Sequence, residues 1–130
     1  MLAGLVAAAI AGGAVEWGGS RSHERDLTLV YIGADDCAPC RVWQRDVVTS
    51  FRATPKFQHI AYREVKSRTL FDILKDENWP DDLREYRAQL GRGAGVPMWL
   101  VIADREIVGR GYGASQWQGA ILPMLEALSR

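Results

Sequence analysis

The sequence is poor in the residues that build metal sites and disulfide frameworks. Its 130 residues include two histidines and two cysteines, and both cysteines, Cys37 and Cys40, lie in one CxxC motif. A bridge between cysteines so close in sequence closes almost no loop and adds little stability. A structural zinc site needs four sulfur or nitrogen ligands, and His23 and His59 lack the spacing of a second ligand pair. A zinc-binding module is therefore the least favoured interpretation of this motif.

A net charge is also missing, because 16 Lys and Arg residues balance 16 Asp and Glu residues. No overall field attracts polyanions, so nucleic acid is not an expected partner. The glycine-rich run GRGAG at 91–95 follows a predicted helix and precedes a predicted strand. This order is the reverse of what a dinucleotide-binding loop requires, and we expect no nucleotide cofactor.

No apolar run reaches the ~20 residues that span a bilayer. The first 15 residues, MLAGLVAAAIAGGAV, are apolar throughout and have the length of a signal-peptide core, although no basic residue precedes them. We predict that residues 1–16 form a signal peptide or membrane anchor, with a buried N-terminal helix as the alternative. Residues 17–130 are then one globular domain, since the chain is 48% hydrophobic and long enough for a single core.

The cysteines follow an apolar run, LTLVYIG at 27–33, that predicts a strand buried on both faces. A turn then leads into a predicted helix over 37–51, where Pro39 suits the first turn. Four side chains recur at steps of three and four, which places them on one buried helix face. They are Cys40, Trp43, Val47 and Phe51. The spacing therefore predicts an accessible Cys37 at the helix start and a sheltered Cys40 one turn later.

The rest of the chain alternates between strand and helix patterns. The expected elements are a strand over 57–65 that carries His59, two helical pieces within 67–90, a hairpin of strands at 96–103 and 106–113, and a final helix over 116–130. Asp81 and Ser115 are the expected helix caps, and Pro123 predicts a kink or a late start in the final helix. This order predicts an α/β fold whose central mixed sheet of about four strands has helices on both faces.

A CxxC motif directly after a buried strand and at the start of a helix is typical of a redox site. The helix N-terminus favours the thiolate form, which is the form that attacks disulfides. Cys40 lies close enough to attack the resulting mixed disulfide and release the partner. We therefore predict a thiol-disulfide oxidoreductase with Cys37 as nucleophile, Cys40 as resolving thiol and no cofactor beyond this redox-active disulfide.

The motif CAPC at 37–40 and the run GVPMWLVIADREIVGRGYG at 95–113 together resemble the thioredoxin superfamily over residues 27–130. The resemblance implies a thioredoxin-like fold in which Pro97 is the cis-proline and Val96 pairs with an extended substrate. It also implies a substrate loop at Gly111 or Gly113. The substrate-binding residues expected from it are Ala38, Val96, Pro97 and Tyr112, with Met98 completing an apolar contact patch.

The sequence departs from this family beside the motif. Ordinary thioredoxins carry Trp before and Gly after the first cysteine, where this chain has Asp36 and Ala38. The buried acid that they carry six residues before that cysteine falls at Tyr31. Asp35 and Asp36 place negative charge beside the motif and oppose thiolate formation. Glu64 is either a substitute for the missing acid or, as we favour, a surface carboxylate.

The Ala-Pro pair and the apolar start are similar to those of exported thioredoxin-like proteins of bacteria. This implies a periplasmic protein, or one tethered through residues 1–15 and facing the periplasm, with the cytoplasm as the alternative. The expected partners are protein thiols and disulfides and an upstream electron donor or acceptor, in a monomer that serves cell redox homeostasis. A second hypothesis is a non-catalytic binding protein of the same fold, whose CxxC is an inert or docking disulfide.

Overall fold

Four strands form one mixed sheet in the order β2-β1-β3-β4 in the computed structural model, which describes residues 26–92 and 95–130. The strands are β1 (Leu27–Ala34), β2 (Ala61–Ser67), β3 (Met98–Ala103) and β4 (Glu106–Tyr112). β1 pairs in parallel with β2 and antiparallel with β3, and β3 and β4 form a hairpin. Both central strands are buried on both faces, as the apolar run at 27–33 predicts. The predicted signal peptide or anchor at 1–16 lies outside the described residues.

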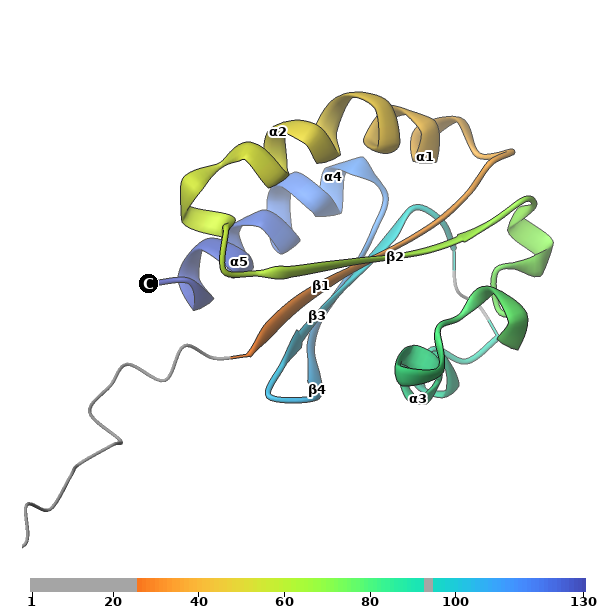
Figure 1. Ribbon diagram of the computed structural model, residues 1–130. Helices are drawn as coiled ribbons and strands as arrows, with labels where there is room; N and C mark the ends of the chain where they lie inside the picture. The colour runs from red at the N-terminus through yellow and green to blue at the C-terminus, as the bar shows by residue number, and fades with distance from the viewer. Residues whose placement is uncertain (1–25, 93–94) are drawn as a thin grey trace, which may run out of the picture.

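Helical segments cover both faces of the sheet (Figure 1). One face carries α1 (Ala38–Val42), α2 (Val48–Ala53), α4 (Ala114–Gln116) and α5 (Leu122–Leu128), while α3 (Arg84–Gln89) lies on the other. Two π-helical turns, η2 (Trp43–Val47) and η7 (Trp117–Ile121), join α1 to α2 and α4 to α5. The predicted α/β fold is therefore confirmed, and its layers place the helix that begins after Cys37 along the buried centre of the sheet.

Trp43 is the centre of the core under α1 and α2. Its ring lies 4.5 Å from that of Trp117, 5.0 Å from that of Trp99 and 5.5 Å from that of Tyr31, measured between ring centroids. Aromatic pairs at such distances add ~0.5–1.5 kcal/mol each beyond the area that they bury. Because Trp43 follows Cys40 by one helical turn, this packing also holds the cysteine-bearing helix on the sheet.

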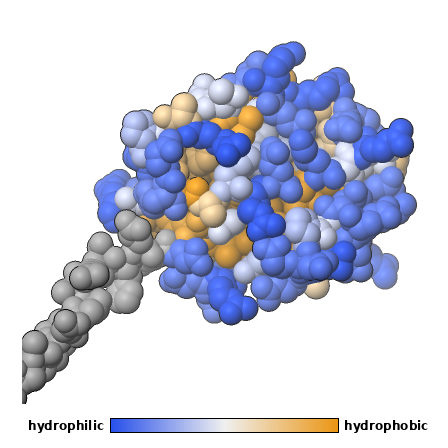
Figure 2. All heavy atoms as spheres, viewed as in Figure 1, coloured by the Kyte–Doolittle hydropathy of each residue, from blue (hydrophilic) through white to orange (hydrophobic). Residues whose placement is uncertain are grey.

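The other face has a smaller core, in which α3 and the segments before it cover residues of β1 and β3. The outer surface seen in Figure 2 is mostly hydrophilic, with apolar residues gathered in patches near the middle of that view. In the part of the chain that the structure describes, no helix combines the length and the apolarity needed to cross a bilayer.

The second strand begins later than its sequence pattern predicts. Residues 55–57 form a 3₁₀ turn, η3 (Pro55–Phe57), and His59 lies exposed in the turn after it. Amide groups here bond three residues back, as from Ile60 to the carbonyl of Phe57 at 3.1 Å. This tight turn lets Phe57 stack on Phe51 at 4.9 Å between ring centroids. The prediction of a strand over 57–65 was therefore wrong at its start, because aromatic packing in the turn overrides strand propensity.

The prediction of two helical pieces within 67–90 was half wrong. The first piece, predicted over 69–75, contains the 3₁₀ turn η4 (Leu70–Asp72), and α3 is the α-helix of the second piece. Two further 3₁₀ turns, η5 (Asp76–Asn78) and η6 (Asp81–Leu83), lie between η4 and α3. Side chains take the carbonyls that a helix would use: the Trp79 indole donates to Ile73 O at 2.6 Å, and the Asn78 amide donates to Asp72 O at 2.7 Å. Asp81 lies inside η6, pairs with Arg84 and caps no helix, contrary to prediction.

The final helix begins one residue before its predicted cap. Gly113, with φ of 81°, precedes it, and Ser115 lies inside α4. Gly113 therefore takes the helix-start position, because glycine adopts positive φ without strain. Pro123 follows the π turn η7 and lies in the first turn of α5. The predicted late start was wrong, because contiguous helical turns already begin at Ala114.

Replacing Trp43 by Ala is expected to lower the free energy of unfolding by ~3–5 kcal/mol, because the deletion leaves a cavity among aromatic rings. Urea unfolding at neutral pH measures this change. Phe71→Ala is the matched control, since this aromatic side chain is 87% exposed and its truncation should cost less than ~0.5 kcal/mol. An equal loss in the two variants would contradict the placement of Trp43 in the core.

Candidate functional site

The two cysteines form a disulfide at the N-terminus of the helix that follows β1. Cys37 is the N-cap of α1, Pro39 lies in the first turn, and the two cysteine Cα atoms are 5.2 Å apart. The backbone N–H of Cys40 points at Cys37 Sγ, 3.3 Å away. A sulfur that accepts a bond from a helix N-terminal amide is stabilised when it carries negative charge.

The two sulfur-bearing side chains differ in exposure less than predicted. Cys40 is fully buried, and Cys37 is 8% exposed, so Cys37 presents only a narrow edge to solvent. The predicted order of accessibility is right, but the description of Cys37 as an accessible residue was wrong. Both cysteines belong to the core cluster that contains Trp43, Trp99 and Trp117.

The turn before the disulfide is fastened to the end of β2. The N–H of Asp35 donates to Ser67 O at 3.0 Å, and the N–H of Leu70 donates to the Asp36 carboxylate at 3.0 Å. The Arg41 guanidinium donates to Asp35 O at 2.9 Å. The two aspartates therefore have structural partners around the turn, which nothing in the sequence pattern indicated, because Leu70 is 34 residues away.

The segment that precedes β3 lies against the same core. The Val96–Pro97 peptide bond is cis, and the carbonyl of Pro97 accepts the N–H of Gly113 at 2.9 Å. Val96 is half-buried and packs against the cluster that contains both cysteines. Ala38 is exposed in the first turn of α1. Three of the substrate-binding residues predicted from the sequence thus lie around the disulfide or in the segment packed beside it.

Tyr112, the fourth of these residues, lies at the end of β4. Its side chain is 53% exposed and covers Gly95, where an added Cβ would collide with the ring. A pocket of about 510 Å³ lies beside Tyr112, near the start of β3 and the end of β4. It is lined by Gly95, Met98, Arg110, Gly111, Tyr112 and Gln116. Met98 was predicted to contribute to an apolar contact patch with Ala38, Val96 and Tyr112, but it is only 2% exposed and contributes almost nothing to the surface there.

Tyr31 is buried beneath the cysteine-bearing helix and is hydrogen bonded on both sides. Its hydroxyl donates to Cys40 O at 3.2 Å and accepts from the Gln44 amide at 2.9 Å. Burial raises the pKa of Tyr31 to about 12, with Gln44 opposing this shift and Glu64 and Asp35 adding to it. Tyr31 therefore stays neutral through the physiological range and does not replace a carboxylate as a base.

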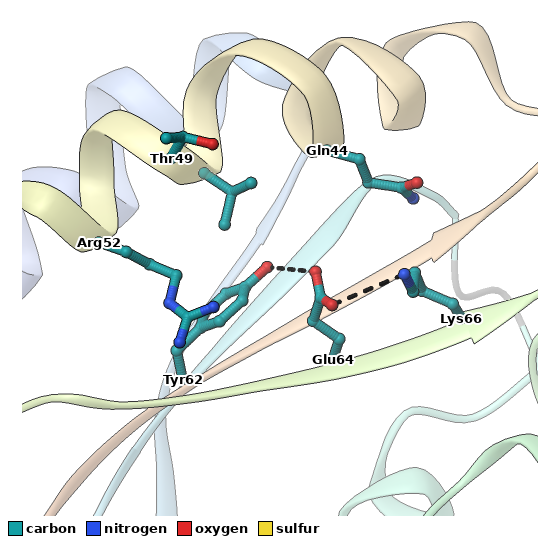
Figure 3. A pocket seen from close by; sticks show the side chains of 7 residues that line it. Gln44, Thr49, Arg52, Tyr62, Glu64 and Lys66 are labelled. Atoms are coloured by element: carbon teal, nitrogen blue, oxygen red, sulfur yellow. Dashed lines mark hydrogen bonds and ion pairs between the residues drawn. The ribbon is translucent and has the colours of Figure 1, made fainter.

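Glu64 lies beside Tyr31 in the strand register and lines a pocket between β2 and α2 (Figure 3). It accepts the Tyr62 hydroxyl at 2.9 Å and lies 3.7 Å from the Lys66 ammonium. The pocket, of about 380 Å³, is lined by Gln44, Val48, Thr49, Arg52, Tyr62, Glu64 and Lys66. Glu64 is the sole carboxylate on its walls, and its side chain is 33% exposed. It is thus a partly exposed carboxylate with basic and phenolic partners.

Within residues 26–92 and 95–130, no three His, Cys, Asp or Glu side chains are grouped to hold a metal ion.

No protein-family model and no curated protein matches the sequence. Solved structures do match. The periplasmic thioredoxin SoxS of Paracoccus pantotrophus has 18% identity and a TM-score of 0.51, covering 79% of this chain and 95% of that one. Thioredoxin f of spinach chloroplast has 14% identity and a TM-score of 0.56, covering 90% and 88%.

The chain has the thioredoxin fold. Oxidised thioredoxin of Plasmodium falciparum is a third similar structure, at 16% identity and a TM-score of 0.50, covering 82% of this chain and 85% of that one. Within this thioredoxin fold, Tyr31 stands at the position where the family resemblance implies a buried acid. A neutral phenol here ties the backbone of Cys40 to the sheet, whereas a carboxylate would accept a proton.

Raising the pH from 10 to 12 is expected to destabilise the protein, and Tyr31→Phe is expected to remove part of that loss. The folded-state pKa of Tyr31 lies above its usual value of 10, so the folded state keeps a proton that the unfolded state releases. The contribution of the protonated Tyr31 to the free energy of unfolding is fully present below pH 10 and is lost as the pH rises toward 12. Its size is on the order of 2–3 kcal/mol, since one pKa unit is worth about 1.4 kcal/mol.

Urea unfolding of the two proteins at pH 8 to 12 measures this difference. Burial also raises the pKa values of Tyr62 and Tyr86. These two residues account for the decrease in the free energy of unfolding with pH that remains in the variant. Identical pH slopes for wild type and Tyr31→Phe would show that Tyr31 titrates normally.

Proposed function

We propose that this protein is a thiol-disulfide oxidoreductase that exchanges disulfides with protein substrates through Cys37 and Cys40. The observation that carries the proposal is the Cys37–Cys40 disulfide at a helix N-terminus of a thioredoxin fold. A thioredoxin fold with a disulfide at this position supports a redox function. The second support is the cis Val96–Pro97 segment, which packs against the core cluster that holds both cysteines.

In the reduced protein, the Cys37 thiolate attacks one sulfur of a substrate disulfide. The substrate S–S bond breaks, a mixed disulfide forms at Cys37, and the other substrate sulfur leaves as a thiolate that takes a proton from solvent. The amide of Cys40, which already points at Cys37 Sγ, stabilises the attacking charge. Val96 and Pro97 would bind the substrate backbone as an added strand, and Ala38 and Tyr112 would contact its side chains.

Cys40 then releases the substrate. Its sulfur attacks Cys37 Sγ, the bond to the substrate breaks, and the second substrate sulfur leaves and takes the proton that Cys40 gives up. The substrate has gained two electrons and two protons, and the protein holds the Cys37–Cys40 disulfide. An upstream dithiol must reduce this disulfide before the next turnover, and the same steps in reverse oxidise a dithiol substrate. No further cofactor takes part.

Cys37→Ser is expected to abolish dithiothreitol-driven reduction of insulin disulfides, because the attacking sulfur is gone. Cys40→Ser should retain the first step and accumulate a covalent complex with insulin that reducing agent releases. Turbidity of the released insulin chain and non-reducing gel electrophoresis measure the two effects. Full activity in Cys37→Ser would refute the mechanism.

The same reduced protein tests the second hypothesis, a binding protein with an inert disulfide. Slow alkylation followed by mass analysis is expected to label Cys37 well before Cys40, in keeping with their exposures. Equal labelling at all pH values, together with no insulin reduction by the wild type, would favour the inert disulfide. The equilibrium of the pair with glutathione then determines whether the protein acts as reductant or oxidant.

We also propose that the protein acts as a monomer in the periplasm, or at the membrane facing it, in cell redox homeostasis. The apolar run at residues 1–15 and the likeness to periplasmic thioredoxin SoxS support this location. The full chain expressed in a Gram-negative bacterium is expected in the osmotic-shock or membrane fraction. A chain that lacks residues 1–16 should stay in the cytoplasm. Cytoplasmic recovery of both chains would contradict the proposal.

A further inference from the structure

Phe71 is the most exposed large apolar side chain in the described part of the molecule, at 87% exposure, and its neighbour Leu70 is 46% exposed. Both lie in η4, directly after β2. Exposed apolar residues are common on protein surfaces, so exposure alone has little meaning. What distinguishes this pair is how firmly its backbone is tied to the turn that precedes the disulfide.

The connection to the disulfide turn consists of two hydrogen bonds. The N–H of Leu70 donates to the carboxylate of Asp36, which is the residue before Cys37, at 3.0 Å. The N–H of Asp35 donates to Ser67 O at 3.0 Å. The two loops therefore form one structural unit, and the apolar pair lies at the edge of the redox site.

The backbone of the pair is also held on its other sides. The Ser67 hydroxyl donates to Thr69 O at 2.5 Å, and the N–H of Asp72 donates to the same carbonyl at 3.2 Å. Asp72 pairs with Lys75 at 2.8 Å, and Ile73 is buried in the core beside α3. Phe71 thus projects into solvent from a backbone that is fixed before and after it, so binding a partner would order little additional chain.

We propose that Leu70 and Phe71 form a substrate subsite that binds an apolar side chain of the polypeptide segment flanking the substrate disulfide. The inference rests on the proposed function and names its substrate class. β1, which leads to the disulfide, lies between β2 and β3 in the sheet. Leu70 and Phe71 follow β2 on one side of it, and the cis Val96–Pro97 segment precedes β3 on the other side. A substrate that crosses the disulfide between these segments would contact both.

The size of the pair argues for a peptide segment as its occupant. Two side chains are far too few for a stable interface between folded proteins, which buries ~1,200–2,000 Å². They suffice for a single anchor residue, and an aromatic anchor next to a main-chain contact is a common way to bind an extended peptide. Asp36 is then a positioning residue, because its carboxylate orients the loop that carries the subsite.

Two synthetic peptides with the same intramolecular disulfide test the subsite, one with Leu and Phe flanking a cysteine and the other with Ser at those positions. The wild type is expected to reduce the apolar peptide with at least a fivefold higher kcat/KM. Phe71→Ser should bring the ratio of the two kcat/KM values close to one. Val108→Thr, which alters an exposed apolar residue of β4, should keep the wild-type ratio.

Variants of Asp36 separate positioning from charge. Asp36→Asn keeps an oxygen acceptor for the N–H of Leu70 and is expected to keep the preference for the apolar peptide. Asp36→Ala removes the acceptor and should lower the preference at least twofold. If Asp36→Asn and Asp36→Ala lowered it equally, the positioning role would be wrong.

Three outcomes would overturn the subsite. One is a wild type that reduces both peptides equally well, and another is a Phe71→Ser variant that keeps the preference. The third is a wild type that sediments as a dimer while Phe71→Ser sediments as a monomer, since the pair would then be a self-association surface. A wild type that reduces neither peptide under dithiothreitol would instead refute the proposed function itself.

Discussion

The packing of Trp43 against the sheet is the interaction on which the site depends. Its indole contacts aromatic rings from β1, β3 and η7, so it joins the cysteine-bearing helix to the central strands and to the C-terminal helical segment. Cys40 lies one turn before it on the same helix face and is therefore fully buried. Cys37, at the helix end, keeps the small exposed edge through which an external sulfur can approach. The two cysteines thus differ in exposure because the aromatic rings around Trp43 cover Cys40 fully and Cys37 incompletely.

The neutral Tyr31 changes the chemistry expected beneath the disulfide. Its hydroxyl is fully engaged by Cys40 O and the Gln44 amide, and its raised pKa keeps it protonated. The hydrogen bond reaches the backbone carbonyl of Cys40, so Tyr31 holds the backbone of that cysteine in place. Under the proposed mechanism the proton of the fully buried Cys40 passes to the leaving substrate sulfur. Glu64 lines a pocket together with Gln44, and its negative charge, like that of Asp35, adds to the raised pKa of Tyr31.

The redox site combines three segments that are far apart in the sequence. The turn at Asp35 and Asp36 is bonded to the loop after β2, and the cis Val96–Pro97 segment packs against the same core. The Asp36 connection runs from its carboxylate to the N–H of Leu70, the Asp35 connection runs from its N–H to Ser67 O, and the cis segment is held by apolar packing of Val96. All three connections lie at or beside strand ends, where backbone groups no longer paired within the sheet bond to neighbouring loops.

The sequence by itself determined the local elements whose signal is strong and short-ranged. These are the doubly buried β1, the helix that begins after Cys37, the β3–β4 hairpin and the α/β class, because apolar periodicity and turn residues act within a few positions. It also located the two cysteines and the proline before β3. It failed at His59 and Asp81, where side chains of residues such as Phe57 and Trp79 pack or bond in ways that replace regular structure.

Only the tertiary structure decided the environment of each reactive group. The near-complete burial of Cys37, the link from Asp36 to Leu70 and the neutrality of Tyr31 all arise between residues at least nine positions apart or from enclosure by several elements. No periodicity encodes such pairs, because a hydrogen bond or a desolvated hydroxyl depends on distances that exist after the sheet and helices have packed. The sequence therefore located the sulfurs, and the packing around them set their access and their partners.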